Sequence, residues 1–78
     1  MNAKFALIQL EDNLVMSVDV YETHEDAVAE RYNCQKSLEE DYPNGIKYFY
    51  DEEDYFCAYS DEFSTTYSVK VIEIANAK

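Results

Sequence analysis

Hydrophobic residues recur along this chain with two different spacings, one typical of β-strands and one typical of an α-helix. Residues 4–10 are apolar on both faces, as a central strand would be. Residues 14–21 alternate with period two, which predicts a second strand with one buried face. One alternating set is Leu14, Met16, Val18 and Val20, and the other is Val15, Ser17, Asp19 and Tyr21. The polar segment 11–13 suits a turn, so the residues before Glu22 are expected to form a β-hairpin.

A helical period follows and begins at Thr23. The segment 23–26 resembles a capping box with Asp in place of the usual Glu or Gln, and its acidic residues suit the positive end of the helix dipole. The line of the helix expected to face the core holds Ala27, Cys34 and Leu38. The helix is expected to end near residues 40–41, because the residue before Pro43 is pushed out of the α region.

After the helix, hydrophobic residues again recur with the short spacing of β-strands. Residues 46–50 and 55–59 are expected to pair as strands across a four-residue loop, 51–54, which lacks glycine. On the first of these strands, Ile46, Tyr48 and Tyr50 are expected to share one face, and Lys47 and Phe49 the other. Residues 60–65 form a polar connection, and residues 66–75, rich in β-branched side chains, form the last strand. The predicted order is β-β-α-β-β-β, which is an α+β fold with a single helix packed on an antiparallel sheet.

Composition limits the chain to one acidic domain, residues 1–78, with one core. Its 47% hydrophobic content is that of a folded protein, but 17 acidic residues against 6 Lys and Arg give a formal net charge of -11. Such a protein does not bind nucleic acid directly through phosphates, and it avoids anionic membranes. Basic proteins, divalent cations or no partner at all remain.

The compartment expected from the sequence is the cytoplasm. The apolar run near the N-terminus is too short for a secretory signal, and no stretch approaches the roughly 20 apolar residues of a membrane span. In the cytoplasm Cys34 and Cys57 are expected to be reduced thiols.

The strongest candidate site is an acidic region that spans residues 39–62. Nine acids there face one base, Lys47, so the local net charge is -8. These acids are Glu39, Glu40, Asp41, Asp51, Glu52, Glu53, Asp54, Asp61 and Glu62. Three tyrosines beside them, Tyr48, Tyr50 and Tyr55, have the large, stiff side chains that dominate interfaces and stack on guanidinium groups. A surface that meets a positively charged partner and an ordinary solvated loop are both consistent with this pattern.

No cofactor, no metal and no catalytic activity are expected. The segment that begins at Asp51 fails the EF-hand pattern, because Phe56 stands where a glycine is needed, and leaves at most weak Ca²⁺ binding. His24 is the only histidine, and no nucleotide-binding, nucleophile-elbow or zinc-type spacing occurs. Arg31 falls within the apolar helix face, and its guanidinium is expected to reach a carboxylate such as Asp19 or Glu73.

Three functions from different classes fit these observations. The first is a nucleic-acid mimic that occupies the basic groove of a DNA- or RNA-binding protein, because dense carboxylates can imitate the charge spacing of DNA. In size and charge the chain is similar to small phage-encoded inhibitors of host restriction, CRISPR or DNA-repair enzymes, a resemblance of composition that covers no aligned positions. The second is an interaction module for a basic protein without such mimicry, and the third is a small structural protein that forms a homodimer.

Added salt is expected to raise the melting temperature of this protein. The excess negative charge repels itself in the compact state, and salt screens that repulsion. Calorimetry across a sodium chloride series measures the effect. A flat or falling response would instead show that the charges are paired or bind a specific cation.

Overall fold

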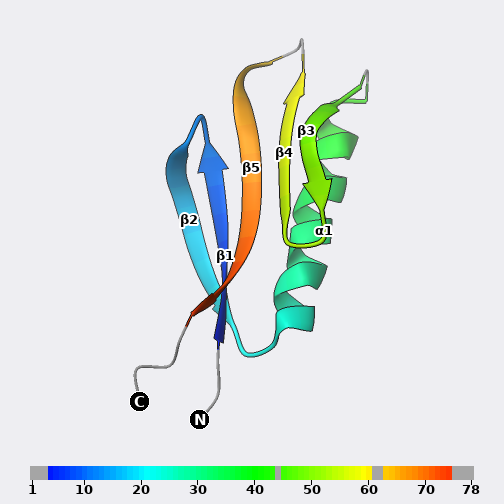
Figure 1. Cartoon of the computed structure of the whole chain (residues 1–78). Helices are drawn as coiled ribbons and strands as arrows, with labels where there is room; N and C mark the ends of the chain where they lie inside the picture. The colour runs from blue at the N-terminus through cyan, green and yellow to red at the C-terminus, as the bar shows by residue number, and fades with distance from the viewer. Residues whose placement is uncertain (1–3, 44, 61–62, 75–78) are drawn as a thin grey trace.

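The computed structural model describes residues 4–43, 45–60 and 63–74, and shows one helix on one face of a five-stranded sheet (Figure 1). The elements in chain order are β1 (Lys4–Glu11), β2 (Leu14–Tyr21), α1 (His24–Asp41), β3 (Lys47–Glu52), β4 (Tyr55–Ser60) and β5 (Phe63–Ile74). All neighbouring strands are antiparallel, in the spatial order β2-β1-β5-β4-β3. The predicted α+β class and element order are confirmed.

The first hairpin turns through two residues, Asp12 and Asn13. Both have positive φ, 55° and 69°, which is the pattern of the tight turn whose twist matches the flanking strands. Asp and Asn tolerate this left-handed region better than other side chains. The predicted polar turn is therefore confirmed, and it aligns β1 with β2.

The helix begins and ends where the sequence predicts. Thr23 is extended, and its hydroxyl accepts a hydrogen bond from the Asp26 N–H at 3.1 Å, which satisfies one of the free donors of the first turn. At the other end the Tyr42 N–H donates to the Leu38 carbonyl at 3.1 Å, directly before Pro43. The helix of 18 residues is about 27 Å long.

The core lies between α1 and the middle strands of the sheet. Its fully buried cluster consists of Leu7, Ala27, Phe56, Ala58, Val69 and Val71, with Cys34 and Leu38 packed at its margin. The expected inward line of the helix is therefore correct. The prediction that β1 is a central strand also holds, because β1 lies between β2 and β5 and buries both Ala6 and Leu7.

The second strand differs from its prediction of one buried face. β2 is an edge strand, and its apolar side chains are exposed: Leu14 by 69%, Val15 by 60%, Met16 by 62%, Val18 by 54% and Val20 by 55%. A bulge also interrupts the alternation, since Ser17 pairs with Gln9 while Val15 pairs with Leu10, which leaves Met16 as an extra residue. The physical reason is that one helix covers one face of the sheet, over its middle strands.

The second half of the chain corrects two loop predictions. Glu52 pairs with Tyr55, so the β3–β4 hairpin turns through two residues, Glu53 and Asp54, and not through the four predicted. β5 begins at Phe63, so most of the expected polar connection 60–65 belongs to strands, while Asp61 and Glu62 lie outside the described residues. Pairing with the long neighbouring strand overrides the polar composition of this segment.

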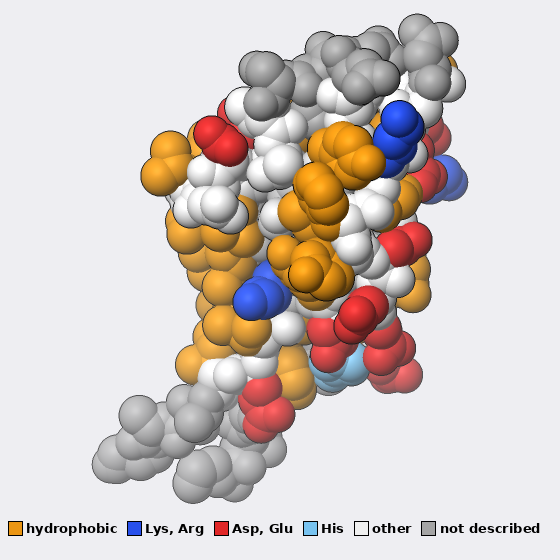
Figure 2. Space-filling view, turned by 45° about the horizontal axis from the view of Figure 1, so that its top comes forward, with side chains coloured by type: hydrophobic (Ala, Val, Ile, Leu, Met, Phe, Trp, Pro, Cys, Tyr) orange, Lys and Arg blue, Asp and Glu red, His pale blue; other side chains and the backbone are white. Residues whose placement is uncertain are grey.

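The face of the sheet turned away from α1 is called the open face below. By strand register its apolar members are Ile8, Leu10, Val15, Val18, Val20, Ile72 and Ile74, followed by Phe49, Tyr50, Tyr55 and Tyr59. Figure 2 shows hydrophobic side chains gathered over the sheet, and acidic side chains along one margin of the same view.

Replacing a core leucine should cost far more stability than replacing an exposed one. Leu7→Ala is expected to lower the free energy of unfolding by about 2–5 kcal/mol, because a fully buried side chain leaves a cavity. Leu14→Ala, at the exposed end of β2, should change it by less than about 0.5 kcal/mol. Urea unfolding followed by circular dichroism measures both. Equal losses would contradict the placement of the core.

Candidate partner-binding site

Three contacts join α1 to β3 and its turn. The Tyr48 hydroxyl donates to Glu39 Oε2 at 2.5 Å, Gln35 Nε2 donates to Asp51 Oδ1 at 3.1 Å, and His24 Nε2 lies 2.7 Å from Asp54 Oδ1. The helix positions fall from 39 to 35 to 24 as the hairpin positions rise from 48 to 51 to 54, so the two segments run in opposite directions. The four carboxylates along this line, Glu39, Asp51, Glu53 and Asp54, are called the acidic seam below.

Each of three seam carboxylates has a fixed neighbour and still reaches solvent. The side chain of Asp54 is 55% exposed although it pairs with His24, whose side chain is 39% exposed. Glu39 and Asp51 are exposed as well, and they line one shallow hollow together with Tyr32, Gln35 and Lys36. The seam therefore presents negative charge from ordered positions on a helix and a hairpin.

Tyr48 is held in its neutral form by this arrangement. Partial burial and, after it, the hydrogen bond to Glu39 together raise the pKa of its hydroxyl to about 12, because a phenolate would lose that bond and face a carboxylate. The ring of Tyr48 points toward the helix and meets the Phe56 ring edge-on, with centroids 6.1 Å apart. Tyr48 therefore links the seam to the core.

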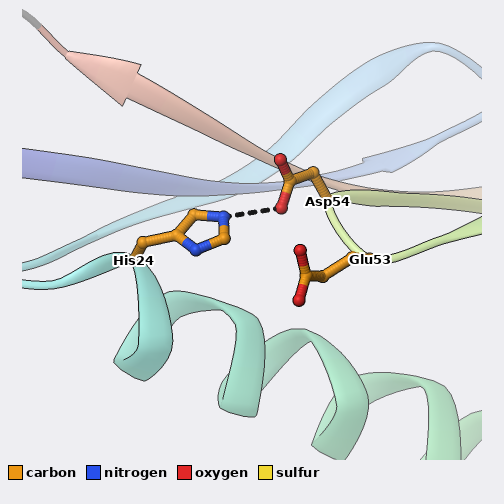
Figure 3. Close-up of side chains that lie close together, drawn as sticks. All are labelled: His24, Glu53 and Asp54. Carbon is orange, nitrogen blue, oxygen red and sulfur yellow. Dashed lines mark hydrogen bonds and ion pairs between the residues drawn. The ribbon is translucent and has the colours of Figure 1, made fainter.

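At the end of the seam where the start of α1 meets the β3–β4 turn, three possible metal ligands come together (Figure 3). His24 at the start of α1 and Glu53 and Asp54 in the β3–β4 turn each offer a ligand atom, and these atoms lie within 4.8 Å of one another. An imidazole with two carboxylates is a donor set that suits a divalent transition metal. Asp51 and Glu52, the other two acids of segment 51–54, are not part of this group.

The other predicted site residues are divided between different surfaces. Asp41 lines a hollow with Gln9 and Glu30 on the opposite flank of the helix, and Glu40 is exposed on α1 one residue earlier. Tyr50, Glu52 and Tyr55 belong to the open face by strand register. Asp61 and Glu62 lie outside the described residues. The structure thus brings together Glu39, Tyr48, Asp51, Glu53 and Asp54 from the predicted set.

The aromatic residues of β3 face differently from the expected alternation, which placed Tyr48 and Tyr50 on one side. Tyr48 pairs with Ala58 and Tyr50 pairs with Cys57, so Phe49 is an extra, bulged residue. Tyr50 therefore lies on the open face with Phe49, whose ring stacks on Tyr59 at 4.4 Å between centroids.

The sequence reasoning missed several members of this surface: Phe49, Tyr59 and Lys70. Lys70 sits beside the aromatic rings, with its ammonium 5.3 Å from the centroid of Tyr55. The pairing of aromatic residues in β3 with those in β4 was a signal available in the sequence, but the bulge was not.

Arg31 is fully buried and does not reach Asp19 or Glu73 as predicted. Its Nη1 donates to Gln35 Oε1 at 2.8 Å, and its guanidinium carbon lies 4.0 Å from the Tyr32 ring centroid and 5.6 Å from that of Phe56. Its Nε has no hydrogen-bond partner among the described residues. Gln35 therefore stands between the buried cation and Asp51, and carries the contact from one to the other.

Comparisons of the chain with protein-family models, with curated proteins and with solved structures found no match. Within the described residues, α1 is the one helix, and it is not apolar enough over its length to cross a membrane. The inference of function therefore depends on the surfaces themselves.

Removing the Glu39 carboxylate should make Tyr48 easier to ionise. In Glu39→Gln we expect the pKa of Tyr48 to fall below about 12, because the charged acceptor that favours the neutral hydroxyl is gone. Spectrophotometric titration at alkaline pH measures this, with Glu40→Gln, one residue along the helix, as the matched control.

The free energy of unfolding should decrease at alkaline pH as Tyr48 ionises. Because the folded-state pKa of Tyr48 is raised, its contribution to folding is complete below about pH 10, the ordinary tyrosine value, and is lost as the pH rises toward 12. Tyr48→Phe should therefore show a shallower loss of stability between pH 10 and 12 than the unaltered protein. An identical loss in both proteins would contradict the role given to Tyr48.

Proposed function

We propose that this protein is a non-enzymatic acidic binding protein that occupies the basic groove of a nucleic-acid-binding protein by imitating nucleic-acid charge. The observation that carries the proposal is the separation of charge between the two sides of the molecule. Among the described strand residues that face away from α1, one is acidic, Glu52, whereas the helix and the seam are densely acidic.

The charge spacing on the helix side is of the right order for mimicry. Nine acids occupy α1 and the adjoining hairpin: Glu25, Asp26, Glu30, Glu39, Glu40, Asp41, Asp51, Glu53 and Asp54. Spread over both flanks of a helix about 27 Å long, they amount to one carboxylate per about 3 Å of its length. One strand of B-DNA carries one per about 3.4 Å, and the duplex one per about 1.7 Å. The density therefore resembles that of a single strand.

Carboxylates held in fixed positions bind a basic groove more favourably than carboxylates on a flexible segment. A flexible acidic tail loses conformational entropy when its side chains are ordered by a partner. Glu39, Asp51 and Asp54 are already oriented by Tyr48, Gln35 and His24, so less entropy is lost on binding. The proposal also sets the protein in the cytoplasm, where nucleic-acid-binding enzymes act and where the free thiols Cys34 and Cys57 stay reduced.

The chemistry of the seam supports binding more than catalysis. His24 is the only histidine in the sequence, and its Nε2 is engaged by Asp54 at an exposed position. The described hollows next to the seam are open, so they exclude little water from any reacting group. Among the kinds of protein that the composition suggests, this surface fits phage-type inhibitors of restriction or CRISPR enzymes.

Affinity capture from a bacterial lysate tests the proposal. We expect a nucleic-acid-binding protein to be retained, to be released by moderate salt, and to be displaced by added double-stranded DNA, because the same basic groove is used. A partner that resists salt and ignores DNA would contradict mimicry.

A quadruple variant of the seam makes the test specific to these residues. E39Q/D51N/E53Q/D54N should keep the fold, since it removes mutual repulsion, and should weaken capture at least about tenfold. The matched control, E11Q/D12N/D19N/E73Q, removes four acids outside the helix and the seam and should weaken it much less. Equal effects of the two variants would show that net charge, and not the seam, is recognised.

A further inference from the structure

The open face is unusually apolar for a surface exposed to water. Val18, Val20 and Tyr50 are more than half exposed there, and Ile72 and Ile74 are exposed by 41% and 39%. Five strands about 4.8 Å apart and about 25 Å long give this face an area of about 600 Å². The apolar residues cover most of this face, and apolar patches of about 300–600 Å² on monomers are often interaction sites.

The charged residues on the open face also differ from those on the rest of the molecule. By register the described strand residues that face away from α1 include three of the six basic residues, Lys4, Lys47 and Lys70, and one acid, Glu52. Lys4 is neutralised by Glu22 at 2.6 Å. In a chain of net charge -11, the described part of this face lacks the excess of carboxylates found on the helix side, so another molecule of the same chain meets less repulsion here than at the helix side.

We infer that the open face binds the open face of a second copy, so that two sheets pack face to face with the helices outside. Sheets packed in this way lie about 10 Å apart, and each helix lies a further layer out, so the two acidic helix layers are separated by about 30 Å. This distance exceeds the Debye length of about 8 Å at physiological salt, so their repulsion is screened. Face-to-face packing is thus the arrangement that hides the apolar face and keeps the acids apart.

The size and chemistry of the face fit a dimer of moderate affinity. Two faces of about 600 Å² bury about 1,200 Å² together, which is the lower end of specific interfaces. The aromatic half supplies Phe49, Tyr50, Tyr55 and Tyr59, the residue types enriched in interface cores. Lys47, Lys70 and Glu52 give each copy both signs of charge, so the face of one copy offers a carboxylate as well as ammonium groups to the other. Nucleic acid or an acidic protein would be repelled by the rest of the chain.

This inference does not depend on the proposed function, and salt separates the two. Screening of the outer acids should strengthen self-association, whereas it should weaken binding of a basic partner to the seam. Sedimentation of the full chain from about 1 µM to about 1 mM should show a monomer–dimer equilibrium in the micromolar range, shifted toward dimer at 0.5 M compared with 0.05 M sodium chloride. A monomer at all concentrations and both salt levels would overturn the inference.

Two variants locate the interface. Val18→Glu and Tyr50→Glu each place a carboxylate on the open face at an exposed position, and each should raise the dimer dissociation constant about 30-fold or more. Leu14→Glu adds the same charge to β2, but on the side that faces α1. This variant should change the dimer dissociation constant less than about threefold. Circular dichroism verifies the fold of each variant. Equal weakening by all three would place the interface elsewhere.

The thiol of Cys57 provides a check that does not alter the face. Cys57 lies on the open face, on β4 between Ser68 of β5 and Tyr50 of β3, and is half-buried. In Cys34→Ser, which leaves Cys57 as the one thiol, the rate of labelling by a disulfide reagent should fall as the protein concentration rises through the dimer range. A constant rate in a sample that sedimentation shows to be dimeric would mean that the copies meet by another surface, such as the β2 edge, and would overturn the inference.

Discussion

A single helix covers one face of a five-stranded sheet, and most other features of this molecule follow from that constraint. The helix packs against β1, β5 and the aromatic ring of Phe56, and small side chains at Ala27 and Ala58 let the two layers approach closely. With no second helix in the described chain, the opposite face keeps its β-branched and aromatic residues at the surface. The chain therefore folds around one core and presents a second apolar surface on the opposite face of the sheet.

The same constraint accounts for where the charges lie. Acids that follow the outward helix positions or the turns cost little, since they remain in water, whereas acids on the open face would be desolvated whenever that face is covered. Of the 15 acids among the described residues, the strand register assigns one, Glu52, to the open face. A surface that only needed to be soluble would have no reason to exclude carboxylates so strictly. The distribution agrees with the two proposed binding surfaces, which lie on opposite sides of the sheet.

Much of the fold could be predicted because local signals agreed with one another. The Thr23 cap and the Pro43 stop bound the helix, and Asp12 with Asn13 suited a tight turn, so these elements were predicted almost residue by residue. The bulges at Met16 and Phe49 could not be predicted, because they depend on how neighbouring strands align. For that reason the sequence misassigned the face of Tyr50, and it identified the acids of the seam without their partners.

Arg31 shows why the core and the seam are best regarded as one unit. A buried guanidinium in a chain rich in carboxylates would be expected to take one as a partner, yet its neighbours are Gln35 and the rings of Tyr32 and Phe56. The amide of Gln35 accepts from Arg31 and donates to Asp51, so it aligns its dipole between the cation and the anion. Asp51 thereby gains part of the attraction of a buried cation while it stays in water, where it avoids the desolvation that a direct buried pair would cost. The buried charge orients an exposed carboxylate, which links the order of the acidic seam to the packing of Phe56 in the core.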